Sequence, residues 1–245
     1  MLGNIQRDLV KWIHLNVKDA DLTLRILARH HGRVLNTSKL GRLMGISYHT
    51  VNRRIEALVN ADLLRLLFPM RVKPGRRLLK SPKIYVRNTA ILLQLLGIQS
   101  AIELQESTLR EQIFKGFMIE QIVSREQAKN SGSLFCYYGG FGGPHICLII
   151  DRLRSRTGII FKFKNMLEPG DWTCLKSALK EELVKRGFIV YPGNRAFFAA
   201  RDLIAVPALG FLDQYNLLTN DKLSIQDIRE ILRPYNSDKH NVVYI

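Results

Sequence analysis

The sequence predicts an α+β protein in which a winged helix-turn-helix domain precedes a mixed-sheet α/β domain. Three observations lead to this fold class: two short amphipathic helices around a glycine turn, a basic hairpin after them, and a later change from helical to strand periodicity. The expected parts are residues 1–98 for the winged domain, 107–215 for the α/β domain, and 216–245 for a C-terminal helix and tail.

The helix-turn-helix is predicted within Leu35–Leu64. A helix over Thr37–Met44 is expected to enter a tight turn at Gly45, and a second helix over Tyr48–Asn60 is expected to follow, capped by Ser47. The apolar residues fall where two crossed helices would share a core, namely Leu40, Met44, Ile46, Val51, Ile55 and Leu58. This pattern is typical of proteins that bind DNA.

Five more elements complete the first domain. Helices are predicted over Ile5–Asn16 and Ala20–His31, and the two wing strands over Leu63–Phe68 and Ile84–Val86. A helix or helical turn over Asn88–Leu96 is expected to close the domain.

The second domain is expected to follow a linker over Gly97–Glu106. A helix is predicted over Thr108–Val123, followed by a loop over Ser124–Ser133. The remaining predicted elements are strands over Leu134–Tyr138, His145–Asp151, Gly158–Phe163, Phe188–Tyr191 and Leu203–Val206, and helices over Asp171–Arg186 and Ser224–Leu232. Such an order predicts helices packed on a mixed sheet.

The net charge of +16 is concentrated in the first part of the chain. Residues 1–100 hold 18 Lys or Arg and 5 Asp or Glu, a net +13, whereas residues 101–245 carry a net +3. This asymmetry indicates a surface for nucleic acid or an acidic partner in the first domain.

Other features of the composition indicate a cytoplasmic protein. The three cysteines are odd in number and lack metal-ligand spacing, which suits a reducing compartment. The N-terminus has no signal-peptide layout, and no apolar run approaches the roughly 20 residues of a membrane span. No membrane partner is therefore expected.

Candidate DNA contacts lie on the outward face of the second helix and on the basic hairpin. The helix would offer side chains to base edges, and the hairpin would offer cations to phosphates of double-stranded DNA. The candidates are Ser47, Tyr48, His49, Thr50, Asn52, Arg53, Arg71, Lys73, Arg76, Arg77, Lys80 and Lys83. The alternative is a winged helix used only for protein contacts. Its basic hairpin would then be solvated or docked on another domain.

Several runs resemble the C-terminal region of bacterial and archaeal AAA+ type ATP-binding proteins. They are Arg7-Asp8, Gly45–Leu58, Arg77–Ile98, Gly116–Ile122 and Arg186–Gly193. The resemblance implies a winged helix followed by a restriction-endonuclease-like domain of the PD-(D/E)XK type. The phosphate loop of that family's ATPase half has no counterpart in this sequence, which indicates a fragment, a truncated gene or a remnant.

The resemblance also implies a degenerate nuclease site at Glu120, Cys147, Lys162 and Lys164. Cys147 and Lys162 stand where the family has acidic residues that bind Mg²⁺, so one carboxylate would face two ammonium groups. We therefore expect no enzyme activity, no bound metal and no cofactor. The expected function is that of a DNA-binding accessory fragment of an AAA+ ATPase. A docking module for a separate ATPase or for self-association is the alternative, and a Mg²⁺-dependent nuclease is ranked last.

Overall fold

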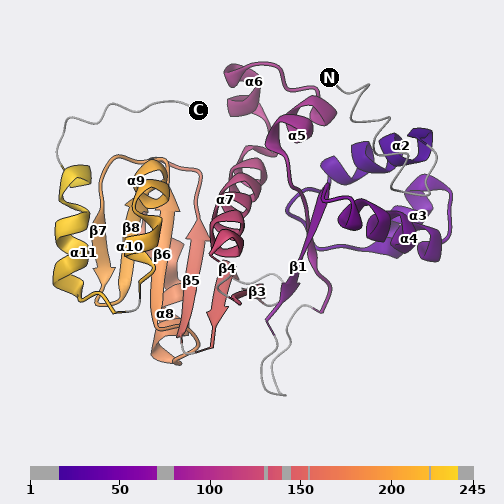
Figure 1. Ribbon diagram of the computed structural model, residues 1–245. Helices are drawn as coiled ribbons and strands as arrows, with labels where there is room; N and C mark the ends of the chain where they lie inside the picture. Colours follow the sequence, from indigo (N-terminus) through magenta and orange to yellow (C-terminus); the bar gives the residue numbers. More distant parts are fainter. Residues whose placement is uncertain are drawn as a thin grey trace. The chain divides into compact units, whose positions relative to one another are not determined.

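The computed structural model describes residues 17–70, 80–129, 132–139, 145–153, 155–220 and 222–236. The chain divides into two compact units (Figure 1). The first combines Met1–Phe68 with Lys80–Phe117, and the second combines Pro69–Leu79 with Met118–Ile245. The long helix α7 (Arg110–Ala128) contributes residues to both units. The mixed α and β content confirms the α+β class in its broad form.

The first unit is built from helices around one antiparallel strand pair. Strand β1 (Leu64–Pro69) pairs with β2 (Lys83–Val86), with Leu64 opposite Val86. The helices are α2 (Val17–Ala28), α3 (Thr37–Met44), α4 (Tyr48–Asn60), α5 (Thr89–Leu96), α6 (Ala101–Glu106) and the first part of α7. Their shared core includes Leu27, Leu40, Val51, Ile55, Leu58, Leu64 and Ile84. Burying these side chains stabilises the unit, because apolar area leaves water.

Local capping sets the ends of α3 and α4. The Asn36 side chain accepts a hydrogen bond from the backbone N–H of Lys39 at 2.9 Å and so begins α3. Gly45 ends α3 in the left-handed region, at a φ of 67°, which suits a residue without a Cβ atom. The Ser47 hydroxyl accepts from the backbone N–H of Thr50 at 3.1 Å and begins α4. These bounds agree with those predicted for the two helices.

The second unit contains a mixed sheet with the strand order β3-β4-β5-β6-β8-β7 among the described residues. The strands are β3 (Leu134–Gly139), β4 (His145–Arg152), β5 (Ser155–Phe161), β6 (Arg186–Tyr191), β7 (Phe197–Ala200) and β8 (Leu203–Pro207). Strands β3, β4 and β5 form an antiparallel meander, whereas β5, β6 and β8 run parallel. Strand β7 pairs antiparallel with β8.

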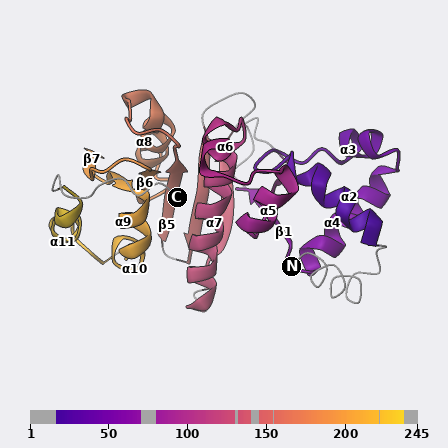
Figure 2. The same cartoon turned by 90° about the horizontal axis from the view of Figure 1, so that it is seen from above.

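Helices pack on both faces of this sheet (Figure 2). Helix α8 (Thr173–Lys180) lies so close to one face that a Cβ at Gly158 would stand 2.8 Å from the Leu175 side chain. Helices α9 (Ala208–Asp213) and α10 (Tyr215–Leu218) cover the other face, where the Phe188 and Phe211 rings meet edge to face at 5.2 Å. Helix α11 (Ile225–Ile231) follows and begins with a capping box between Ser224 and Asp227.

Several predicted elements differ from the structure. The segment expected to be a linker contains α6, because the Ser100 hydroxyl caps it by accepting from the N–H of Glu103. Helix α7 continues to Ala128 through residues expected to form a loop. The helix predicted over Asp171–Arg186 is shorter in the structure. Helix α8 ends at Lys180, because Glu182 has a φ of 55°, which a helix does not allow.

Strand β7 and helices α9 and α10 were not predicted. Strand β7 has only four residues and α9 only six, so neither segment is long enough to show a clear strand or helix periodicity. The helix predicted over Ile5–Asn16 and the end of the C-terminal tail lie outside the described residues. Among the helices that the structure describes, none is long and apolar enough to cross a bilayer.

Candidate nucleic-acid interface

Helix α4 is held against α2 by a charged contact that the sequence did not single out. The Arg54 guanidinium lies 2.8 Å from the Asp19 carboxylate, and its other nitrogen lies 3.4 Å from the Thr23 hydroxyl. Only 10% of the Arg54 side chain is exposed. Together with the buried Val51, Ile55 and Leu58, this contact fixes which face of α4 turns outward.

The outward face of α4 carries polar side chains that are free to bind a ligand. Tyr48 is 49% exposed, and His49, Asn52 and Arg53 are exposed as well. Among the described residues, the side chains of Asn52 and Arg53 make no hydrogen bond or ion pair. The Tyr48 and His49 rings stack at 3.8 Å with a tilt of 34°. An amide, a guanidinium and two rings are thus presented on one turn and a half of helix.

The two hydroxyl candidates at the start of α4 have a structural role. The Ser47 hydroxyl caps the helix and also lies 2.9 Å from the Thr50 hydroxyl. Thr50 is half-buried. Because the two hydroxyls bond to each other, any contact with a phosphate would have to share or replace that bond.

An open depression of about 590 Å³ lies beside these residues at the turn between α3 and α4. It is lined by Ser38, Gly41, Arg42, Gly45, Ile46, Ser47 and Tyr48. Gly41 allows the close approach of the turn, because a Cβ there would lie 2.7 Å from the carbonyl oxygen of Ile46. The exposed Arg42 adds a cation that the sequence interpretation missed, although its place off the apolar face of the first predicted helix could have indicated it.

The structure describes only part of the predicted basic hairpin. Arg71, Lys73, Arg76 and Arg77 lie outside the described residues. Lys80 is exposed, as a phosphate contact requires. Lys83 does not fit its predicted role, because it is 8% exposed.

The burial of Lys83 follows from its position in the strand pair. It belongs to β2, whose four residues are all buried, and it is bridged to Val34 on the side away from β1. All four side chains of this strand are buried, so Lys83 lies inside the unit rather than on a surface that a ligand could reach.

The structure does not bring the four predicted nuclease-like positions together. Ile149 pairs with Gly158, which faces α8, and Cys147 lies two residues earlier on β4, so it faces α8 too. Glu120 belongs to α7, and α7 lies on the opposite face, because its Glu126 contacts Arg152 of β4. Glu120 and Cys147 are therefore separated by the sheet.

Lys162 and Lys164 pair with a carboxylate that was not among the candidates. Their Nζ atoms lie 3.2 Å and 2.5 Å from the Asp171 carboxylate, just before α8. These contacts lower the pKa of Asp171 against the effect of its burial. Lys164 also lies 3.9 Å from the Glu168 carboxylate. Both carboxylates are thus engaged by ammonium groups, which do not favour a divalent metal.

The Cys174 thiol near this face is protonated at neutral pH. Burial, with smaller effects of nearby Cys147 and Glu181, raises the pKa of Cys174 to about 11. A thiol must lose its proton to become a strong ligand. Within the described residues, no group of three or more His, Cys, Asp or Glu side chains could hold a metal ion.

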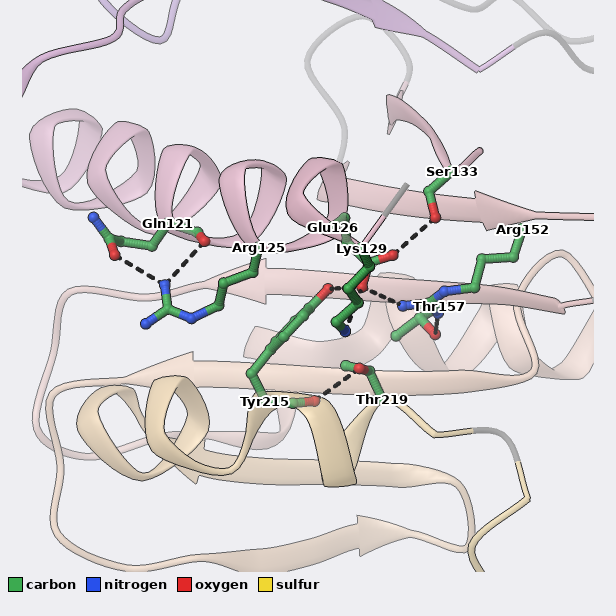
Figure 3. Close-up of polar contacts among 9 residues, drawn as sticks. All are labelled: Gln121, Arg125, Glu126, Lys129, Ser133, Arg152, Thr157, Tyr215 and Thr219. Carbon is green, nitrogen blue, oxygen red and sulfur yellow. Dashed lines mark hydrogen bonds and ion pairs between the residues drawn. The ribbon is translucent and has the colours of Figure 1, made fainter. Parts of the chain in front are cut away.

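A buried carboxylate on α7 forms the most connected polar cluster of the second unit (Figure 3). The Glu126 side chain is 1% exposed and lies 2.9 Å from a nitrogen of Arg152. The Tyr215 and Ser133 hydroxyls donate to it at 2.9 and 2.8 Å, and Lys129 lies 3.2 Å away.

These partners decide the protonation state of Glu126. Burial alone would raise the pKa of Glu126, but the bonds from Arg152, Ser133 and Tyr215 outweigh it and lower the pKa to about 2. The carboxylate is therefore ionised and fully paired. Such a cluster joins α7, β4 and α10 on one face of the sheet, and its carboxylate is engaged by these partners rather than offered to a ligand.

The comparisons with known proteins add relatives but no activity. Residues 2–101 match the family model of a domain of unknown function, DUF8612. The chain is 29% identical over 208 residues to uncharacterized proteins of Mycobacterium tuberculosis (Rv2008c) and Mycobacterium bovis (Mb2031c). The match covers 83% of this chain and 45% of each relative, so the chain spans about half the length of these curated relatives. No solved structure matches the chain.

Proposed function

We propose that the first unit binds double-stranded DNA through the outward face of α4. The observation that carries this proposal is the contrast between neighbouring arginines: Arg54 is buried and paired, whereas Arg53 is exposed and has no partner among the described residues. An unpaired guanidinium beside an unpaired amide, on a helix held firmly by its other face, suits hydrogen bonding to base edges.

In this mechanism α4 enters the major groove. Arg53 would donate two hydrogen bonds to a guanine, or Asn52 would exchange two with an adenine, each contributing about 1–3 kcal/mol of discrimination. The exposed Lys80, Arg42 and the rest of the basic hairpin would contact phosphates and position the helix. In this proposal, helices α2, α3 and α4 together with strands β1 and β2 act as a winged helix.

A mobility-shift titration with random-sequence duplex tests the proposal. The purified chain is expected to bind at roughly 50 mM salt and to lose affinity steeply as salt rises, because each phosphate contact releases counterions. Absence of any duplex complex at that low salt would refute DNA binding.

Protein docking is the second candidate, and one observation favours it. Leu43 of α3 is 62% exposed, so the first unit presents a large apolar side chain to solvent near the turn between α3 and α4 in the chain. The partner would be a separate ATPase of the AAA+ class or a second copy of this chain. Recovery of a phosphate-loop ATPase in a pull-down, with no duplex affinity, would favour docking over DNA binding.

The resemblance to AAA+ proteins makes an accessory role for such an ATPase part of this proposal, without an enzyme activity of its own. The charge around Lys162, Lys164 and Asp171 supports the non-enzymatic interpretation. Incubation of supercoiled plasmid with the chain and Mg²⁺ or Mn²⁺ is expected to produce no nicked product. Metal-dependent nicking that survives repeated purification would contradict the non-enzymatic interpretation.

A further inference from the structure

A second depression, of about 530 Å³, lies in the second unit at the end of the sheet where β6 and β8 begin. Its walls come from the start of β6, the turn between β7 and β8, and the segment that leads into α11. The polar residues that line it are Arg186, Arg201, Asp202, Ser224, Gln226 and Arg229. Three guanidinium groups thus share one hollow.

Arg186 is fixed in place by backbone oxygens. One of its nitrogens donates to the carbonyl of Asn220 and the other to the carbonyl of Leu223, both at 3.0 Å. These acceptors are neutral, so they orient the guanidinium without cancelling its charge. Arg186 therefore supplies a permanent positive charge in the lining of the hollow.

The other two arginines keep their donors available. The Arg229 guanidinium carbon lies 5.2 Å from the centroid of the Phe198 ring, a cation–π contact that leaves its N–H groups unoccupied. Arg201 is exposed, and its side chain has no hydrogen bond or ion pair among the described residues. Both can turn toward a ligand without breaking an existing bond.

Carboxylates do not neutralise this cluster. Asp202 lines the hollow but forms no ion pair with the described residues. Asp227, beside the hollow, accepts from the N–H and hydroxyl of Ser224 in the capping box of α11. The lining therefore keeps an excess of positive charge.

We propose that this hollow binds a phosphate group. Guanidinium groups match phosphate because their planar forks donate paired hydrogen bonds to two oxygens. The hollow has the size of a small-molecule site, and its three arginines suit recognition of a charged group. The phosphate could belong to a small phosphate compound or to a nucleic-acid strand, and the two sources are separated below.

Calorimetric titration of the full chain with inorganic pyrophosphate at roughly 50 mM salt is the test. We expect saturable binding that Arg201→Gln weakens about tenfold, which corresponds to loss of one charge-assisted contact. Arg233→Gln is the matched control, because it removes the same charge from an exposed position outside the hollow, and it should change affinity less than about twofold. Thermal unfolding of Arg201→Gln should match the unmodified chain.

Absence of pyrophosphate binding, or equal weakening by Arg201→Gln and Arg233→Gln, would overturn the proposal. Where binding occurs, a second titration with a short single-stranded oligonucleotide identifies the source. Tighter, Arg201-dependent binding of the oligonucleotide assigns the phosphate to a strand, and equal or weaker binding assigns it to a small compound. Arg53→Ala should leave pyrophosphate affinity unchanged, so this proposal can fail or succeed separately from duplex binding by α4.

Discussion

The outward face of α4 and the Glu126 cluster use the same kinds of side chain in opposite ways. Glu126 is buried and satisfied by four partners, whereas Asn52 and Arg53 are exposed and, among the described residues, have none. A paired buried charge holds elements together and cannot bind a ligand without losing its partners. An unpaired exposed one contributes little to stability and is available for recognition.

The largest expected effect comes from breaking the buried cluster. Glu126→Gln removes the charge opposite Arg152, which is itself only 20% exposed, and should lower the free energy of unfolding by about 3–5 kcal/mol. Denaturant titration measures this loss. Glu230→Gln, on the exposed side of α11, should change it by less than about 0.5 kcal/mol.

Acid should weaken the same cluster without any mutation. The pKa of Glu126 is lowered from 4.5 to about 2 in the folded chain, so its stabilising effect is complete above the unfolded value and disappears as pH falls through the folded one. The free energy of unfolding is expected to fall by on the order of 3 kcal/mol as the pH passes from the unfolded to below the folded pKa. Unfolding curves recorded across it should be clearly less pH-dependent for Glu126→Gln. Identical pH dependence in the two proteins would contradict the assignment.

The neighbouring arginines of α4 give a sharper comparison. Arg53→Ala should weaken preferred-duplex binding by about 1–3 kcal/mol and leave the unfolding free energy within about 0.5 kcal/mol. Arg54→Ala should instead reduce stability by about 1–3 kcal/mol, because it removes the contacts with Asp19 and Thr23. Fluorescence anisotropy and denaturant titration measure the two quantities. Loss of duplex affinity from Arg54→Ala alone would reverse the assigned roles.

The smallest expected effect lies at the cap of α4. Ser47→Ala removes the oxygen that accepts from the N–H of Thr50 and should cost about 1 kcal/mol of stability. Ser38→Ala, at an exposed helical position without a capping bond, is the control and should change the unfolding midpoint by less. An equal shift in both variants would show that the cap does not set the start of α4.

Elements stabilised by local contacts could be predicted from the sequence. The bounds of α3 and α4 follow from Asn36, Gly45 and Ser47, which act within three or four residues of their partners. The buried face of α4 was predicted for the same reason. Its apolar residues repeat at helical spacing.

Features that depend on distant residues could not be predicted. Glu126 lies in a polar stretch expected to be a loop, and its helix continues there because Arg152 and Tyr215, 26 and 89 residues away, satisfy the carboxylate. Lys83 looked like a surface cation, yet all four residues of its strand are buried among residues distant in the sequence. Glu120 and Cys147 looked like one site, but the sheet separates them.

The most direct test of DNA binding by α4 is an amide chemical-shift titration of the isotope-labelled 245-residue chain with random-sequence duplex at roughly 50 mM salt. We expect the largest shifts at Tyr48, His49, Asn52 and Arg53, while the amides around Glu126 stay nearly unchanged. Arg53→Ala should reduce those shifts at equal duplex concentration. No shifts on α4, or shifts confined to other surfaces, would contradict the assignment of α4 as the DNA-binding element.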